Sequence, residues 1–168
     1  TRAPGRGAER GRPAQRLEQE VPESAGMTGR ERARRLLEAL AALGVRLSID
    51  DFGAGYTSLG QLKNLPVTEL KIDRAFVMNL SQDPRDALIV RSIIDLGHNL
   101  GLTIVAEGVE TASVFEDLTA FGCDTAQGYF VSYPTTAAVL DIWRAARPPL
   151  DTGNLDELSL ATKAVLER

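Results

Sequence analysis

The chain has 168 residues, a formal net charge of −4, one cysteine and one histidine. Hydrophobic residues make up 43% and charged residues 25%, which is ordinary globular usage and enough for one domain with a core. The acidic balance gives no reason to expect a nucleic-acid polymer as partner. The single cysteine excludes an internal disulfide, and no Cys/His pair has zinc-finger spacing. A reducing cytoplasm fits this cysteine content best. No run of residues marks the chain as membrane-spanning or secreted, and any membrane attachment would come from another part of a longer protein.

The two ends of the chain differ from its middle. Residues 1–16 are rich in arginine, glycine and proline and lack apolar periodicity, which predicts a disordered segment. A basic arm for nucleic acid is the alternative, but no aromatic residues are interleaved for base stacking. We expect a domain at residues 17–147 and a tail or peripheral helix at residues 148–168.

Within residues 17–147, β-like runs alternate with amphipathic runs. Strands are predicted at residues 17–21, 45–50, 70–73, 102–106 and 125–130, and helices at 28–44, 58–64, 84–101, 111–122 and 136–147. The first helix is expected to carry Leu36, Leu37, Leu40 and Leu43 on one apolar stripe. The last helix is expected to turn Leu140 and Trp143 inward.

Five strands that alternate with helices across short loops predict a parallel sheet of the α/β class. A TIM-barrel-like (β/α) fold needs eight strands, so five would be a partial barrel. An open doubly wound sheet is the alternative.

Charged and polar residues stand where these strands end. Both architectures place functional sites at the carboxyl ends of strands, and the residues found there are Glu20, Asp50, Asp51, Lys71, Asp73, Glu107 and Gln127. Carboxylates that converge repel one another and lose hydration, which a cation relieves. Mg²⁺ or Mn²⁺ suits oxygen ligands of this kind.

Asp50 and Asp51 are adjacent, and neighbours in a regular strand point to opposite faces. They can share a site only where the strand breaks, and the glycines of the following Phe52-Gly53-Ala54-Gly55 permit such a break. The pair either binds metal for attack on a phosphodiester, or Asp51 caps a turn while Asp50 is solvated. Lys71 either holds a water or phosphate or is a salt-bridged edge lysine. The segment 127–129 either contacts a ligand or eases a strand start.

Three segments then show a resemblance to a known family. They are LSIDDFGAGYTSLGQLKNLPVTELKID, GLTIVAEGVET and GCDTAQGYFVSYP. In their order and spacing, these segments resemble the EAL domain family of cyclic di-GMP phosphodiesterases. The resemblance implies a modified TIM barrel of which this chain carries the last five strands, the C-terminal portion of the domain. It implies metal-dependent hydrolysis of cyclic di-GMP to linear pGpG in bacterial second-messenger signalling.

The resemblance also implies roles for individual residues and partners. It implies metal ligation by Glu20, Asp50 and Asp51, catalytic roles for Lys71 and Glu107, substrate binding by Gln127, and supporting roles for Glu23, Asp73 and Glu110. Two divalent ions, Mg²⁺ or Mn²⁺, are expected at such a site. Cyclic di-GMP is the expected ligand, and a homodimer and a linked sensor or diguanylate cyclase domain are compatible with the family.

The chain departs from the family pattern in its first part. No Glu-Ala-Leu motif or asparagine ligand stands in a fitting position before Glu20, Pro22 replaces the usual threonine, and Tyr133 replaces a common basic residue. We therefore expect little turnover from this chain alone. The competing expectations are a non-catalytic module that binds cyclic di-GMP or a protein, and a gene fragment without an independent function.

Overall fold

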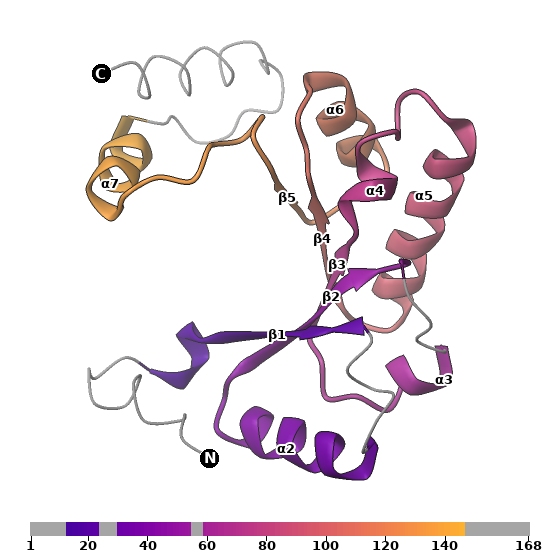
Figure 1. The fold of residues 1–168 in the computed structure, drawn as a ribbon, viewed down its shortest axis with the longest axis vertical. Coiled ribbons are helices and arrows are strands. Elements are labelled where there is room, and N and C mark those ends of the chain that lie inside the picture. Colours follow the sequence, from indigo (N-terminus) through magenta and orange to yellow (C-terminus); the bar gives the residue numbers. More distant parts are fainter. Residues whose placement is uncertain (1–12, 24–29, 55–58, 147–168) are drawn as a thin grey trace.

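A computed structural model describes residues 13–23, 30–54 and 59–146, and within them five strands form one parallel sheet (Figure 1). The strands are β1 (Glu18–Pro22), β2 (Arg46–Phe52), β3 (Glu69–Ile72), β4 (Thr103–Glu107) and β5 (Thr125–Gln127). The helices are η1 (Ala14–Arg16), α2 (Arg30–Ala42), α3 (Leu59–Leu62), α4 (Arg74–Val77), α5 (Pro84–Asn99), α6 (Ala112–Ala120) and α7 (Ala137–Ala146).

The sheet has the strand order β1-β2-β3-β4-β5, and each strand pairs in parallel with the next one along the chain. A doubly wound sheet reverses its strand order at a switch point, whereas a barrel keeps the order sequential. The order therefore confirms the α/β prediction and favours the barrel-type alternative. In Figure 1, α4, α5 and α6 lie along one side of β3 and β4.

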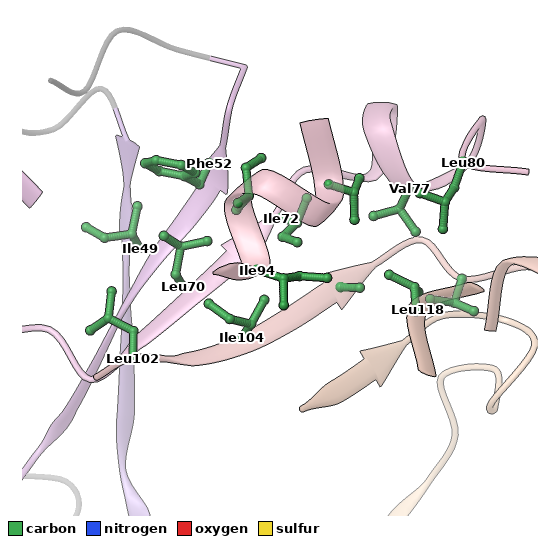
Figure 2. Packing of buried hydrophobic residues seen from close by; sticks show 14 of the residues in the cluster. Ile49, Phe52, Leu70, Ile72, Val77, Leu80, Ile94, Leu102, Ile104 and Leu118 are labelled. Carbon is green, nitrogen blue, oxygen red and sulfur yellow. The ribbon is translucent and has the colours of Figure 1, made fainter. Parts of the chain in front are cut away.

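One face of the sheet carries the hydrophobic core. Ile49 pairs with Leu70, and Leu70 pairs with Ile104, so these three fully or almost fully buried side chains share the face that packs against α5 (Figure 2). From α5, Val90 and Ile94 reach the same cluster with no exposed surface. Each such side chain contributes about 1.5–3 kcal/mol of burial free energy, so this layer fixes the relative positions of the strands.

The opposite face of the sheet is polar. The same registers place Ser48 beside Glu20 and Glu69, and Glu107 beside Gln127, because side chains of a strand alternate between faces. Strand β2 therefore separates its apolar residues from Ser48 and Asp50. This polar face carries the candidate site.

Three leucines expected to be buried are exposed. Leu36 and Leu43 of the α2 region are 61% and 58% exposed, and Leu140 of α7 is 41% exposed, whereas Leu37 is buried. Helix α2 packs against β2 in the described part of the chain, and one contact surface covers only part of a wide stripe. The apolar stripes that the sequence predicted to be buried are therefore wider than the surfaces that are buried in the structure.

Several predicted bounds also differ from the structure. Residues 14–16, inside the segment expected to be disordered, form the 3-10 helix η1, and the sequence did not predict α4. Strand β5 ends at Gln127 rather than at residue 130, because the chain then turns over Val109. Residues 1–12, the predicted cap Thr28 and residues 148–168 lie outside the described part. Among the described helices, none is both long and apolar enough to cross a membrane.

Candidate functional site

The strand β2 is irregular where the two adjacent aspartates lie. Between Ile49 and Phe52 its register with β3 shifts, so β2 has one more residue than its partner there. Asp51 has φ 55°, a left-handed conformation that is uncommon for residues other than glycine. Because of this bulge, Asp50 and Asp51 can both contribute a carboxylate oxygen to the same site. The predicted break in the strand is confirmed.

Lys71 lies at the centre of the site and is 5% exposed. Its Nζ is 2.6 Å from Glu20 Oε1, 2.5 Å from Glu107 Oε1 and 3.6 Å from Asp50 Oδ1. Burial opposes the charged form, but the hydrogen bonds with Glu107 and Glu20 outweigh burial, so the pKa of Lys71 lies above its ordinary value. Lys71 is therefore a cation at physiological pH that joins its own strand, β3, to β1, β2 and β4.

A group of carboxylates surrounds this ammonium. Asp50, Asp51 and Glu107 each place one ligand oxygen within 4.8 Å of the others. Asp50 Oδ1 is buried and lacks a hydrogen-bond partner, although Lys71 Nζ lies 3.6 Å away. A buried carboxylate oxygen without a hydrogen bond is costly, and a bound cation would relieve that cost. The oxygen-only donor set thus fits a hard divalent cation.

Burial and the nearby negative charges both act on the carboxyl group of Asp51. Its pKa is raised by burial and by the neighbouring charges of Asp50 and Asp73, although Lys71 opposes them. Asp73 itself caps α4, where its carboxylate accepts a hydrogen bond of 2.7 Å from the Ala75 N–H. The structure gives Asp73 a local capping contact and an electrostatic influence on Asp51.

The exit loop from β2 is held by Glu23. This residue is 8% exposed, and its Oε2 accepts a hydrogen bond of 3.2 Å from the Gly53 N–H. Gly53 has φ 103°, and a Cβ added there would press on the ring of Phe76. Glu23 therefore holds the backbone at Gly53, two residues after the aspartate pair.

The remaining predicted residues lie at different distances from the carboxylate group. Gln127 is the register partner of Glu107 at the end of β5. Glu20 contacts Lys71, and its charge also acts on Asp51, but it is outside the set of three carboxylates that converge. Glu110 is exposed on the connection between β4 and α6 and is likewise outside that set.

Sequence reasoning missed Ser48. Its side chain has no exposed surface, and its Oγ has no hydrogen-bond partner. Ser48 precedes Asp50 by two residues, so strand alternation puts both on the polar face. That alternation was the available signal, but a serine in a strand is common enough to pass unnoticed.

A second carboxylate contact lies at the opposite end of the same polar face. Burial, together with a hydrogen bond that the protonated carboxyl group shares with Glu18, raises the pKa of Glu69 to about 7, while the charge of Arg46 opposes the shift. Arg46 also forms an ion pair of 2.9 Å with Glu18. This contact joins β1, β2 and β3 at their amino ends, away from Asp50 and Glu107.

Comparison with known proteins identifies the family. The model of the EAL domain matches residues 6–134. The chain belongs to the EAL domain family. It is 50% identical over 121 residues to the bifunctional diguanylate cyclase/cyclic di-GMP phosphodiesterase MucR of Pseudomonas aeruginosa, covering 72% of this chain and 18% of MucR.

Solved structures of EAL proteins agree with the fold. The EAL domain of Mycobacterium smegmatis DcpA superposes with a TM-score of 0.79 at 41% identity, covering 85% of this chain and 65% of that structure. Klebsiella pneumoniae BlrP1, solved as a manganese and cyclic di-GMP complex, gives a TM-score of 0.71 at 34% identity, covering 76% and 32%. The predicted partial TIM-barrel-like fold is confirmed, and the chain spans less than a fifth of MucR's length.

Proposed function

We propose that this chain carries the carboxyl-terminal half of the active site of a cyclic di-GMP phosphodiesterase. The observation that carries the proposal is the convergence of Asp50, Asp51 and Glu107 around the buried Lys71. Support comes from the family match and from MucR, which is named as a cyclic di-GMP phosphodiesterase. The reaction adds water to one phosphodiester phosphorus and breaks its bond to the 3′ oxygen, which yields linear pGpG.

In this proposal, Asp50, Asp51 and Glu107 hold Mg²⁺ or Mn²⁺, with Glu20 at the edge of the group. The bound ions would supply Lewis-acid activation of water and neutralise charge on the phosphodiester. The manganese complex of BlrP1 supports this choice of metal. The Lys71 ammonium has three N–H donors, so on exchanging a carboxylate contact it can donate to the attacking water or to a phosphate oxygen.

The other predicted residues have positioning roles. Glu23 holds Gly53 and thereby the backbone of the aspartate pair. Gln127 stands beside Glu107 in the register and can hydrogen-bond the ligand through its amide. Linked domains in a longer polypeptide are part of the proposal, because MucR is more than five times as long as the matched region.

The second candidate is a module that binds cyclic di-GMP without turnover. Glu20 favours it, because this predicted metal ligand contacts Lys71 and does not join the three converging carboxylates. A site with fewer metal ligands retains charge and shape for a ligand but loses metal affinity.

The test is hydrolysis of cyclic di-GMP by the polypeptide that contains this chain, with Mg²⁺ or Mn²⁺. Asp50→Asn removes a carboxylate from the group, and Asp95→Asn makes the same change on the exposed surface of α5. We expect pGpG formation that is lost in the first variant and kept in the second. Binding without turnover would establish the second candidate, and a protein that neither binds nor hydrolyses the nucleotide would refute both.

A further inference from the structure

Ser48 is a buried polar residue to which the proposed function gives no role. Its side chain has no exposed surface, and its Oγ has no hydrogen-bond partner among the described residues. A hydroxyl group buried in this way costs free energy. The other buried side-chain atom of this kind in the described part of the chain is Asp50 Oδ1, which belongs to the converging carboxylates. Because the two residues are two positions apart on the polar face of β2, Ser48 stands next to the candidate site.

The strands on either side of β2 define the neighbours of Ser48. Its register partner on β1 is Glu20, and its register partner on β3 is Glu69. Register partners on neighbouring parallel strands point to the same face and lie about 4.8 Å apart. The Glu20 side chain is exposed, so rotation about its own bonds can bring its carboxylate to the Ser48 hydroxyl group.

An ion pair crosses β2 beside Ser48. Lys71 Nζ is 2.6 Å from Glu20 Oε1, although β1 and β3 are about 10 Å apart with β2 between them. The Lys71 side chain therefore passes over the polar face of β2 at the level of Ser48 and Asp50. An ammonium attracts a carboxylate more strongly than a neutral hydroxyl group does, so Glu20 contacts Lys71 in place of Ser48.

Lys71 and a divalent cation need the same carboxylates. Asp50 and Glu107 contact the Lys71 ammonium, and both also belong to the group that can hold a cation. Two positive charges at one group of carboxylates repel each other, which weakens the contact between Lys71 and Glu20. Once released, the Glu20 carboxylate needs another hydrogen-bond donor to keep a fixed orientation, and its cross-strand neighbour Ser48 has one.

We propose that Ser48 is a positioning residue, whose hydroxyl group donates a hydrogen bond to the Glu20 carboxylate and orients it toward a bound divalent cation. The inference rests on the proposed function, which puts Mg²⁺ or Mn²⁺ at Asp50, Asp51 and Glu107. Carboxylates that bind a metal are themselves commonly held by a second hydrogen bond. A serine hydroxyl supplies this donor without a charge of its own, so it does not compete with the cation for the carboxylates.

The test measures the Kd of Mn²⁺ alone by calorimetry on the polypeptide that contains this chain, together with its Tm without a divalent cation. The variants are Ser48→Ala, Ser48→Thr, which keeps a hydroxyl group, and Ser92→Ala, which makes the matched change at an exposed serine of α5. We expect Ser48→Ala to raise the Kd about 10- to 100-fold. Its Tm without cation should equal or exceed that of the wild type, because the hydroxyl group has no partner there. Ser48→Thr and Ser92→Ala should keep the Kd within about threefold of the wild type.

A double-mutant cycle with Glu20→Ala shows whether Ser48 acts through Glu20. In the Glu20→Ala protein, the further change Ser48→Ala should alter the Kd by less than about threefold, because the hydrogen bond has already lost its acceptor. A further loss in that background as large as the loss in the wild type would show that Ser48 acts on a different group, and the positioning role would be refuted.

The outcomes separate this inference from the proposed function. If the wild type binds Mn²⁺ and Ser48→Ala binds it equally well, the positioning role is refuted while the proposed function stands. If Ser48→Ala lowers the Tm in the absence of cation, Ser48 has a structural role and the inference is refuted. If the wild type binds no Mn²⁺, the metal-dependent function fails, and the inference fails with it.

Discussion

Replacing Lys71 with methionine is the sharpest test of the site's electrostatics. The change keeps most of the side-chain volume and removes the ammonium that contacts Glu20, Glu107 and Asp50. Removing one partner of a buried ion pair costs about 3–5 kcal/mol. The three carboxylates keep side-chain exposures of 53%, 19% and 25%, so solvent compensates part of that cost. We expect a loss of about 2–3 kcal/mol in the free energy of unfolding.

Urea and thermal unfolding of the variant measure this loss. It corresponds to a decrease in Tm of roughly 5–12 °C for a domain of this size. Lys63→Met makes the same substitution at an exposed lysine and should change the Tm little. Because the variant site is more negative, added Mg²⁺ or Mn²⁺ should raise its Tm more than that of the wild type. A Lys71→Met protein as stable as the Lys63→Met control would show that the ammonium does not balance these carboxylates.

Three further predictions concern the surroundings of the site. Burial raises the pKa of Glu69 to about 7, so its protonated form contributes stability that is fully present below about pH 4.5 and is lost as the pH rises through 7. Glu69→Gln should therefore flatten the dependence of the free energy of unfolding on pH in that window, as measured by urea unfolding. Gly128→Ala should lower the Tm by the equivalent of about 1–3 kcal/mol or more, since its Cβ would overlap the Val109 backbone. Glu23→Ala should lower the free energy of unfolding in urea by about 1.5–3 kcal/mol, because it removes the acceptor of the Gly53 N–H. Glu23→Gln keeps an acceptor oxygen and should retain most of the wild-type stability.

The sequence was sufficient to predict the alternation of strands and helices. Proline and glycine mark most of the boundaries, such as Pro84 at the start of α5 and Gly122 after α6, and those signals act locally. The strand break at the aspartate pair was predictable for the same reason, because Gly53 stands two residues after Asp51. Burial was less predictable. Periodicity identifies the apolar side of a helix such as α2 but not how much of it a neighbour covers, so Leu36 was misjudged.

The centre of the site needed long-range information. The sequence left Lys71 either as a functional residue or as an edge lysine. The hydrogen bond between Lys71 and Glu20 joins residues 51 positions apart. No local pattern predicts which carboxylates meet one ammonium, because that depends on how four strands, β1 to β4, pair with one another. The same limit applies to the Glu18 and Glu69 contact, which is visible only once β1, β2 and β3 are paired.

The two faces of the sheet divide stability and function between them. The face toward α5 is apolar and holds the strands in register, so the polar face can retain groups that do not help folding. Ser48 Oγ and Asp50 Oδ1 are buried there without hydrogen-bond partners, and Lys71 is surrounded by acids. Such groups persist when the rest of the fold compensates for them, and they are expected at functional sites. Cation binding at this face should therefore stabilise the fold, which the Tm of the Lys71→Met variant with and without added Mg²⁺ or Mn²⁺ measures.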